Sequence, residues 1–473
     1  MKHLVIIGGG PGGYAAAFAA AKKGLKVTLI EQEGIGGTCL NWGCIPTKTL
    51  KATAEKLEFL HQAAQFGITL KEAPSLDWPV VSARLNKVKE TLRGGLAKTC
   101  AALGIELVSG RGKLLPGLNV AAVLADGTQK EFKADAVILA TGSRPAGLPG
   151  LAIDGERILS SDHALRLDKL PQKLIIVGGG VIGCEFACIF RTFGVEVHIV
   201  EGMDRLLPLP GVDAAMSRLL FREMKKMKIA MYLGATVSKV TPKPGGGIIA
   251  ELGLSPFIEG EPPAPLPETL EGDCLLLTVG RAPNADGLGL AEAGVNQDSR
   301  GWITADEYMR TSAPGIYAIG DVLGPKHIML AHVASFEGEV AVRNILGEET
   351  AMTYGVVPSA IFTMPEVGSV GLSEEEAAQK GFSIRSASLL VRELGKAQAA
   401  GEIAGEFKLI ADAATDKILG AHMIGPHATE LIAELGLALS TGATVSDIAR
   451  TIHAHPTLAE GWHELALGME ANK

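Results

Sequence analysis

A unit of strand, glycine-rich loop, helix, strand and acidic residue opens this chain. The apolar run Leu4–Ile7 leads directly into the loop Gly8–Gly13, and a helix is expected over Tyr14–Lys22. The next strand, Lys26–Ile30, ends at Glu31, whose carboxylate can accept hydrogen bonds from ribose hydroxyls. In such a unit one glycine makes a tight turn, one lets the backbone approach a pyrophosphate, and one lets the helix pack on the strand. These roles are expected of Gly8, Gly10 and Gly13.

The same unit returns in the middle of the chain. Leu174–Val177 leads into Gly178–Gly183, and the strand Glu196–Val200 ends at Glu201. The first glycine and the acid are 23 residues apart in both copies (8 to 31, and 178 to 201). Two such units predict an α/β chain with two Rossmann-like dinucleotide-binding folds. One would hold a tightly bound flavin and the other an exchangeable nicotinamide.

Two cysteines follow the first unit closely. Cys39 and Cys44 are separated by four residues, in a segment that begins at Gly36, five residues after Glu31. Pro46 suits the first turn of a helix, so Cys44 is expected at a helix N-terminus, where the macrodipole favours a thiolate. A dithiol beside a bound dinucleotide indicates electron transfer between sulfur and a cofactor.

The other four cysteines are expected to be inert. Cys39 and Cys44 form the only close pair expected outside a helix, whereas Cys184 and Cys188 lie one turn apart on the second unit's helix and suit packing. The remaining two, Cys100 and Cys274, are scattered, and no Cys/His pattern has the spacing of a zinc site, so no metal is expected. Such sparse usage suits a reducing compartment in which one pair is catalytic.

Composition excludes several classes of protein. The chain has 473 residues, of which 47% are apolar and 20% charged, as in a large globular enzyme. A net charge of −8 argues against nucleic acid or an anionic membrane as the main partner. No apolar run approaches the roughly 18 residues of a membrane span. The first strand begins so early that no targeting segment is expected before it, which favours the cytoplasm or a mature form that is already trimmed.

Further apolar strands end in turns suited to a cofactor. Asp135–Ala140 ends at Thr141-Gly142-Ser143, Cys274–Val279 ends at Gly280, and Ile316–Gly320 ends at Asp321, which can bind a sugar-like chain. Beyond residue 349 the pattern becomes that of a separate α+β domain. Between Pro242 and Gly272 the chain is rich in proline, including Pro256, Pro262, Pro263, Pro265 and Pro267, and is interpreted as an extended surface excursion from a β-hairpin.

An acid/base pair is expected near the C-terminus. His455 is followed by Pro456, and Glu460 lies five residues after the histidine. Glu460 can orient the ring and raise its basicity.

Together these motifs resemble the flavin-dependent pyridine-nucleotide disulfide oxidoreductases over essentially the whole chain. The resemblance implies FAD-binding (1–148), NAD-binding (149–279), central (280–349) and dimer-interface (350–473) domains. It also implies a homodimer in which the His455–Glu460 pair of one subunit completes the dithiol site of the other.

The resemblance assigns further cofactor contacts. Lys48 would lie near the flavin ring and pair with Glu185. FAD would be bound by Gly8, Gly10, Gly13, Glu31, Lys48, Gly112, Thr141, Gly142, Ser143, Asp321, Met329, Leu330, Ala331 and His332. NAD would be bound by Gly178, Gly180, Ile182, Gly183, Glu185, Glu201, Val237 and Gly280.

The implied reaction oxidises dihydrolipoyl groups. His455 would take a proton from a dihydrolipoyl thiol, and the thiolate would attack Cys39 of a Cys39–Cys44 disulfide. Cys44 would pass the electrons to FAD, which would reduce NAD+ to NADH. The implied partner is the lipoylated acyltransferase of a 2-oxoacid dehydrogenase complex, or the lipoyl carrier protein of the glycine cleavage system.

Some features depart from the family, and other activities stay open. Family members often carry Lys and Glu after the positions of Ala331 and His332, whereas this chain continues Val-Ala-Ser-Phe-Glu. An NADPH-dependent reductase of a small-molecule disulfide is one alternative, against which Glu201 argues because it would repel a 2′-phosphate. A mercuric reductase would need a C-terminal cysteine pair. A non-catalytic scaffold would be expected to lose Cys39, Cys44, His455 or Glu460.

Overall fold

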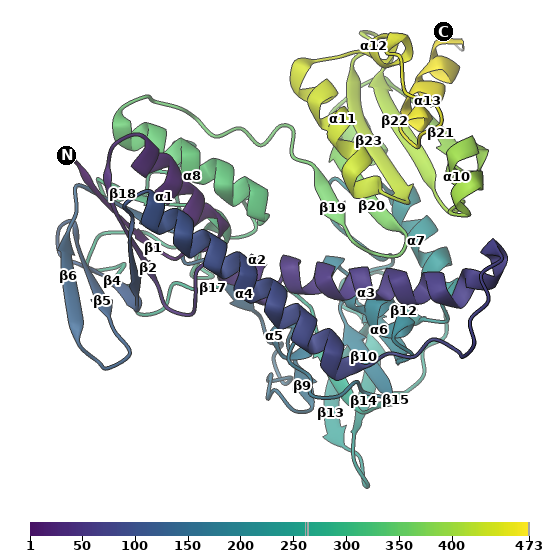
Figure 1. Cartoon of the computed structure of the whole chain (residues 1–473), viewed down its shortest axis with the longest axis horizontal. Helices are drawn as coiled ribbons and strands as arrows, with labels where there is room; N and C mark the ends of the chain where they lie inside the picture. The colour runs from purple at the N-terminus through teal and green to yellow at the C-terminus, as the bar shows by residue number, and fades with distance from the viewer. Residues whose placement is uncertain (261, 263, 472–473) are drawn as a thin grey trace. The chain divides into compact units, whose positions relative to one another are not determined.

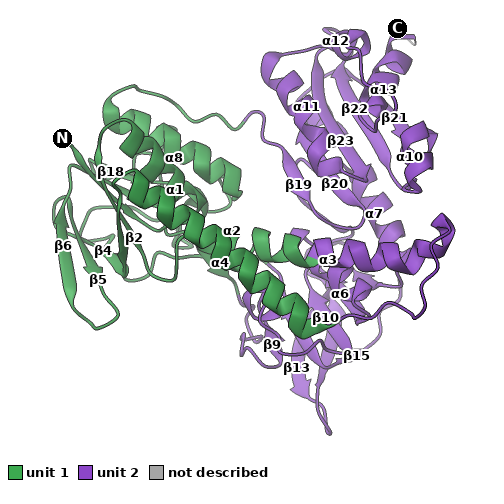
Figure 2. Ribbon diagram, viewed as in Figure 1, with its two compact units in different colours: residues 1–50, 77–146, 280–354 green, residues 51–76, 147–279, 355–473 purple. Residues whose placement is uncertain are grey.

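A computed structural model describes residues 1–260, 262 and 264–471. The chain divides into two compact units, each built from three segments (Figure 2): residues 1–50, 77–146 and 280–354 form the first, and residues 51–76, 147–279 and 355–473 the second. Within the described residues, no helix combines the length and the apolar character needed to cross a bilayer.

The first unit is centred on a five-stranded sheet whose paired strands are all parallel (Figure 1). In spatial order its strands are β18 (Ile316–Ala318), β7 (Ala136–Leu139), β1 (His3–Ile7), β2 (Lys26–Glu31) and β3 (Glu106–Ser109). The central strands β1 and β7 are almost fully buried, as expected for a parallel sheet covered on both faces.

Helices and two small sheets complete this unit. Its helices are α1 (Pro11–Lys22), α2 (Gly37–Trp42), α4 (Trp78–Ala102), the short 3-10 helix η2 (Gly320–Leu323) and α8 (Ala331–Leu346). The small antiparallel sheets are β4 (Arg111–Leu115), β5 (Asn119–Val123) and β6 (Gln129–Lys133), and β8 (Ser143–Pro145) with β17 (Arg281–Pro283). Helix α3 (Cys44–Gln62) begins in this unit and ends in the second.

The second unit repeats the parallel architecture. Its sheet runs β12 (Ala230–Leu233), β11 (Glu196–Glu201), β10 (Lys173–Val177), β16 (Cys274–Leu277) and β9 (Ile158–Leu159). The helices of this part are α5 (Ser161–Ala164), α6 (Val181–Thr192) and α7 (Ala214–Lys226). A three-stranded antiparallel sheet follows, formed by β13 (Ala235–Pro242), β14 (Ile248–Leu254) and β15 (Thr269–Gly272).

The C-terminal part of the second unit is an α+β fold. Its antiparallel sheet runs β19 (Ser359–Ile361), β20 (Glu366–Gly371), β23 (Ile418–Gly425), β22 (Glu406–Asp412) and β21 (Ile384–Leu390). The helices of this part are α9 (Glu374–Gln379), α10 (Gly395–Ala400), α11 (Ala428–Thr441), α12 (Val445–Arg450) and α13 (Glu460–Ala471). Short 3-10 turns occur at η1 (Ala63–Phe66) and η3 (Val391–Glu393).

Most predicted elements are confirmed, and two interpretations need correction. Cys39 was expected outside a helix, but it lies within α2. The Pro242–Gly272 excursion was expected to be extended surface chain, yet it contains β14 and β15, and only residues 255–268 connect them. Pro263 lies outside the described residues. Strand β20 and helices α8, α10, α12 and α13 were not predicted.

Candidate active site

The first fingerprint loop has the geometry of a pyrophosphate cradle. Gly8 has φ +106°, and a Cβ atom built on it would lie 2.2 Å from the carbonyl oxygen of Ala140. A Cβ atom on Gly13 would lie 1.9 Å from the carbonyl oxygen of Gly8. Gly10 precedes the first residue of α1, and a Cβ atom there would meet no atom closer than 3.8 Å. The helix N-terminus is therefore accessible to an anion at the position where a dinucleotide's phosphates bind.

Glu31 holds this loop in shape. Its Oε2 atom accepts a hydrogen bond from the Gly9 amide at 2.6 Å, and its Oε1 atom accepts one from the Glu33 amide at 2.8 Å. The acid at the end of β2 therefore orders the loop in addition to its predicted contact with a ribose.

The dithiol segment packs directly on the fingerprint loop. The Gly36 amide donates to the Gly9 carbonyl at 2.8 Å, and a Cβ atom on Gly37 would lie 2.5 Å from the Cα atom of Gly10. Both positions have positive φ, so glycine is the residue that fits them. This close approach brings Cys39, two residues further on, next to the cofactor cradle.

Cys44 is the first residue of α3, as predicted, and both Cys44 and Cys39 are half-buried thiols. The pKa of the Cys39 thiol is raised, first by a hydrogen bond with Cys44 and then by burial, whereas the charge of Lys48 lowers it. Burial, followed by the charges of both cysteines, also raises the pKa of Tyr14 on α1. The two sulfur atoms therefore interact with each other and with a nearby cation.

The turn after β7 in the first unit contains a buried hydroxyl group without a partner among the described residues. Thr141 Oγ1 is buried and has no hydrogen-bond partner within the described residues. Ser143 Oγ donates to Asp321 Oδ2 at 2.7 Å, and Arg281 Nε lies 2.6 Å from Ser143 Oγ and 3.6 Å from Asp321 Oδ2. The sequence analysis gave Arg281 no role, although this residue directly follows Gly280, a predicted NAD contact. A buried hydroxyl without a partner, two residues before a serine that binds an ordered carboxylate, fits a cofactor with sugar and phosphate oxygens.

The remaining predicted FAD residues fall at two places. A Cβ atom on Gly112 would lie 2.5 Å from Ile7 Cγ2, so this glycine allows β4 to pack against β1. The four other residues surround the start of α8: Met329 and Leu330 precede it, and Ala331 and His332 open it. Their contacts with FAD remain a prediction.

Glu337 is a functional candidate that the sequence analysis missed. Its side chain is buried in α8, where it accepts hydrogen bonds from the Gly320 amide at 2.6 Å and from the Tyr354 hydroxyl at 2.7 Å. Burial raises the pKa of Glu337, although both hydrogen bonds oppose the shift. The Gly320 contact orders the turn that presents Asp321. The spacing of residues in the sequence does not predict the role of Glu337, because Gly320 and Tyr354 each lie 17 residues from it.

The second unit contains an equivalent cradle. Gly178 has φ +108°, and a Cβ atom on Gly183 would lie 1.9 Å from the Gly178 carbonyl oxygen. A Cβ atom built on Gly180 would have no neighbouring heavy atom within 4 Å. Glu201 accepts hydrogen bonds from the amides of Gly179 and Met203, the latter at 2.7 Å. These residues fit a second dinucleotide.

The cation nearest in sequence to Glu201 is already engaged. Arg205 Nη1 donates to the Val212 carbonyl at 3.2 Å and lies 3.5 Å from Ser217 Oγ. Glu201 itself is buried and would repel a 2′-phosphate. The arrangement therefore favours NAD(H) over NADP(H).

The other predicted NAD residues are distributed more widely. Val237 is buried in β13, Ile182 lies in the first turn of α6, and Gly280 has φ +141° at the start of a segment of the first unit. Glu185 is buried in α6, and its Oε1 atom accepts a hydrogen bond from the Phe362 amide at 2.9 Å. Lys48 and Glu185 belong to different units, so their pairing stays a prediction.

The His455–Glu460 pair is formed. Glu460 Oε1 lies 2.8 Å from His455 Nδ1, and Glu460 Oε2 accepts from the Thr457 amide at 2.8 Å. These hydrogen bonds, the Thr457 bond first, lower the pKa of Glu460. The His455 side chain is 79% exposed, so its Nε2 atom is accessible to another molecule. His453, in contrast, has a buried side chain whose Nε2 atom lies 2.8 Å from Glu434 Oε1, so it is not accessible in the same way.

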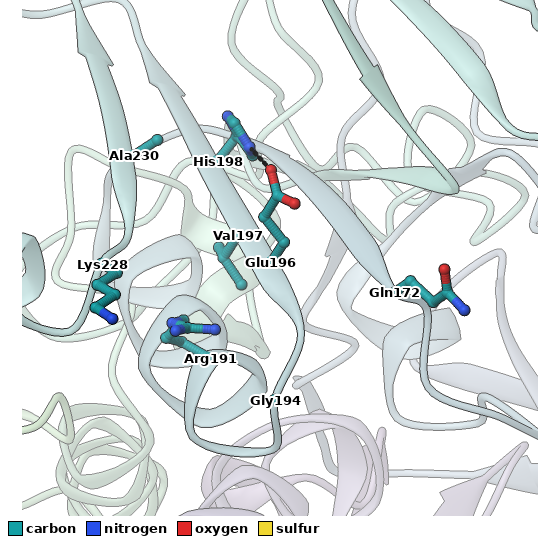
Figure 3. A pocket seen from close by; sticks show the side chains of 8 residues that line it. All are labelled: Gln172, Arg191, Gly194, Glu196, Val197, His198, Lys228 and Ala230. Atoms are coloured by element: carbon teal, nitrogen blue, oxygen red, sulfur yellow. Dashed lines mark hydrogen bonds and ion pairs between the residues drawn. The ribbon is translucent and has the colours of Figure 1, made fainter.

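A separate cavity of about 550 Å³ lies at the amino ends of β10, β11 and β12 (Figure 3). Glu196 Oε1 lies 2.8 Å from both Lys173 Nζ and His198 Nε2, and these groups lower the pKa of Glu196 to about 2. Arg191 Nε donates to the Met227 carbonyl at 2.7 Å. Dinucleotides bind at the carboxyl ends of parallel strands, so this cavity is not the cofactor site.

Comparison with known proteins agrees with this geometry. The family model for pyridine nucleotide-disulphide oxidoreductases matches residues 2–338, and the model for the dimerisation domain of that family matches residues 357–466. The chain is 44% identical to the dihydrolipoyl dehydrogenase of Chlamydia muridarum, covering 98% of this chain and 96% of that protein. It is 39% identical to a dihydrolipoyl dehydrogenase of Bacillus subtilis, covering 99% and 98% of the two chains.

Solved structures show the same fold. LpdA from Mycobacterium tuberculosis superposes with a TM-score of 0.90 at 31% identity, covering 99% of this chain and 100% of that one. The HOCl-induced flavoprotein disulfide reductase RclA from Escherichia coli reaches 0.85 at 26% identity, covering 98% and 99%. The chain therefore belongs to the pyridine nucleotide-disulphide oxidoreductases, an oxidoreductase family that uses FAD and NAD(H).

Proposed function

We propose that this chain oxidises dihydrolipoyl groups to lipoyl groups and passes the electrons to NAD+, as a homodimeric dihydrolipoyl dehydrogenase. The observation that carries the proposal is the position of Cys44, which begins α3 two residues after the end of α2, in a segment packed on the first fingerprint loop. A dithiol placed there can exchange electrons with a cofactor in that cradle. The names of the relatives support the same activity.

The histidine pair supplies the base. Glu460 accepts a hydrogen bond from the Nδ1–H group of His455, which leaves a lone pair on Nε2. In the proposed reaction Nε2 removes a proton from a substrate thiol, and the resulting thiolate attacks the sulfur of Cys39 in the disulfide-bonded state of the protein. The Cys39–Cys44 bond breaks and Cys44 leaves as a thiolate. The second substrate thiolate then displaces Cys39 and closes the lipoyl ring.

The protein stabilises the charge formed in this step. The N-terminus of α3 favours the Cys44 thiolate, and Lys48, one turn further along the same helix, adds a positive charge. When bound, FAD and NAD+ supply the two-electron and hydride chemistry that the side chains lack. The FAD and NAD contacts expected from the family resemblance, including a Lys48–Glu185 pair, belong to this proposal.

The second copy of the chain completes the site. A general base works best when it is held against its substrate and shielded from water. The 79% exposure of His455 in one chain supports a site that is covered by a partner, and the dimerisation domain is the region that carries this histidine. We assign the His455–Glu460 pair of one subunit to the dithiol of the other.

The lipoyl group would arrive on another protein. The proposed carrier is the lipoylated acyltransferase of a 2-oxoacid dehydrogenase complex, or the lipoyl carrier protein of the glycine cleavage system. A reducing compartment such as the cytoplasm fits a chain in which four cysteines, apart from the dithiol, are buried thiols.

Anaerobic titration with dihydrolipoamide tests the proposal. The purified yellow protein should gain long-wavelength absorbance after two electrons and should form NADH when NAD+ is added. Cys44→Ser should remain folded and yellow and lose on the order of a thousandfold in turnover. Cys100→Ser, which changes a buried cysteine on α4, is the matched control and should keep its activity. Undiminished turnover in Cys44→Ser, or reduction by NADPH with indifference to dihydrolipoamide, would refute the proposal.

A further inference from the structure

The proline-rich segment between β14 and β15 carries an exposed aromatic ring. Phe257 is 70% exposed, which is unusual for a phenylalanine that has a defined place in a loop. Pro256 precedes it, and Pro262, Pro265 and Pro267 follow within the same connection. Proline restricts the backbone in the unfolded state, so this segment loses less entropy when it holds one conformation. The described residues 255–260 around Pro256 are therefore suited to presenting the Phe257 side chain.

A chain of hydrogen bonds connects Phe257 to the acid of the second fingerprint. Glu201 Oε1 accepts from the Met203 amide at 2.7 Å. The Met203 carbonyl accepts from the Gly234 amide at 2.9 Å, and the Gly234 carbonyl accepts from the Ser255 amide at 3.0 Å. Ser255 Oγ then accepts from the Phe257 amide at 3.1 Å. The backbone that carries the phenyl ring is thus fixed relative to the Glu201 carboxylate.

The ring itself lies against the residue after Glu201. A Cβ atom built on Gly202 would lie 3.0 Å from Phe257 Cδ2 and 3.3 Å from Ser255 Oγ. On the other side of the loop, Ile258 packs on Gly234, where a Cβ atom would lie 2.4 Å from Ile258 Cδ1. Ile258 therefore anchors the segment, while Phe257 remains exposed beside the end of β11.

The end of β11 is where the adenosine half of a dinucleotide is recognised. In a Rossmann fold the acid at this position binds the adenosine ribose, so the base extends just beyond it. Aromatic side chains stack on bases and exclude water from one face of the ring. An exposed phenyl ring, fixed by hydrogen bonds to the ribose-binding loop, has the chemistry and position for that contact.

We propose that Phe257 packs against the adenine ring of bound NAD(H), and that residues 255–258 form a wall of the cofactor site. The inference rests on the proposed function through the assignment of Glu201 to the NAD ribose. It gives residues 255–258 a role that the composition of this part of the chain alone did not reveal.

Binding of ADP-ribose to the flavin-containing protein, measured by calorimetry, tests the contact directly. Phe257→Ala should weaken ADP-ribose about tenfold, the factor expected for one lost base–aromatic stack. The KM for NAD+ should rise by a similar factor, with kcat and the KM for dihydrolipoamide changed less than about twofold. Phe257→Trp should restore binding, because indole offers a larger stacking face. Phe382→Ala removes another exposed phenylalanine of the same unit and should change neither constant.

The outcomes separate this inference from the proposed function. Unchanged ADP-ribose affinity in Phe257→Ala would overturn the inference, as would a loss confined to binding of the lipoyl carrier, which would make the ring a protein contact. If the unaltered protein reduces no NAD+ with dihydrolipoamide, the proposed function fails. The ADP-ribose titration still decides the role of Phe257 in that case.

Discussion

In the two fingerprint loops, the first glycines, Gly8 and Gly178, have φ angles of +106° and +108°. Cβ atoms on Gly13 and Gly183 would each lie 1.9 Å from the carbonyl oxygen of the first glycine of their own loop. Each loop also has an acid, Glu31 or Glu201, that accepts a hydrogen bond from a glycine amide. The two loops therefore have the same backbone geometry, and we expect the difference in cofactor use to come from the side chains around them.

Those side chains differ at the strand that closes each cradle. Thr278 Oγ1 lies 2.9 Å from the Val177 carbonyl oxygen and 3.0 Å from that of Gly178, so its hydroxyl is satisfied within the second fold. In the first fold Ala140 occupies the corresponding position, and the next residue, Thr141, has a buried hydroxyl without a partner among the described residues. Val279, which corresponds to Thr141, has no hydroxyl. The first fold therefore leaves a buried hydroxyl that the proposed FAD could satisfy, whereas the threonine of the second fold is satisfied by backbone carbonyls.

The helices of the two folds are also held differently. In the first unit α8 packs on α1 through glycine, because a Cβ atom on Gly338 would lie 2.7 Å from the Gly12 carbonyl oxygen (Figure 1). In the second unit Asp213, the N-cap of α7, is bound by Lys408 of β22 at 2.9 Å through both carboxylate oxygens. Lys408 also binds Glu374 at 2.7 Å. Close packing supports one fold, and a buried ionic cluster supports the other.

The largest expected effect comes from placing a methyl group on either first glycine. Gly8→Ala and Gly178→Ala should each combine roughly 1–3 kcal/mol of backbone strain with an atomic overlap. Gly8→Ala should yield protein without FAD, whereas Gly178→Ala should stay yellow and lose about a hundredfold in NAD+ reduction. Visible absorbance and turnover of the purified variants measure the two effects. A colourless Gly178→Ala protein would show that the folds do not act separately.

Removing the ionic support of the second fold should have the next largest effect. Lys408→Met leaves Asp213 buried without its cation, and breaking such a pair costs about 3–5 kcal/mol. Burial alone would raise the pKa of Asp213, but hydrogen bonds from Lys408 and Ala215 hold it below its ordinary value. This stabilisation is therefore present above the unfolded pKa of about 3.9 and is lost as pH falls through the lower folded pKa.

Urea unfolding of Lys408→Met at two pH values checks this prediction. Without the lysine, the pKa of Asp213 should rise, so protonation relieves the buried charge as pH falls. The loss in unfolding free energy should therefore be larger at pH 7 than near pH 4.5. An equal loss at both pH values would mean that Lys408 acts through packing alone.

The unsatisfied hydroxyl of the first fold should contribute a smaller effect. Thr141→Val should weaken FAD retention about tenfold, because one hydrogen bond contributes roughly 0.5–1.5 kcal/mol. The reciprocal change, Val279→Thr, should leave NAD+ affinity within twofold. Reconstitution of the flavin-free proteins with FAD measures the first effect, and the KM for NAD+ measures the second. If Thr141→Val retains FAD as tightly as the unaltered protein, the proposed difference between the folds is wrong.

The smallest effect is expected from Arg205. Its guanidinium group is engaged by Val212 and Ser217, so Arg205→Ala should change the preference for NAD+ over NADP+ less than twofold. Glu201→Gln removes the charge that repels a 2′-phosphate. It should therefore reduce the preference for NAD+ over NADP+ by more than Arg205→Ala does. Comparison of kcat/KM for the two cofactors gives both values. A marked gain or loss of NADP+ use in Arg205→Ala would show that Arg205 takes part in cofactor binding.

The sequence by itself determined the parts of this protein that are local. The glycine spacing, the acids at Glu31 and Glu201, and the start of a helix at Cys44 follow from short-range geometry, and the pair His455–Glu460 lies within five residues. Position 8 requires glycine because of its positive φ angle and the nearby Ala140 carbonyl. Such requirements produce the glycine spacing that the sequence shows.

Only the tertiary structure decided the contacts between distant segments. Glu337 with Gly320 and Tyr354, and Asp213 with Lys408, join residues whose side chains have no mutual pattern in the sequence. The role proposed for Phe257 depends on the contact of its ring with Gly202, which spacing along the chain does not predict. The physical reason is that burial and hydrogen-bond satisfaction depend on which segments meet. Spacing along the chain does not encode this for partners that are 17 to 195 residues apart.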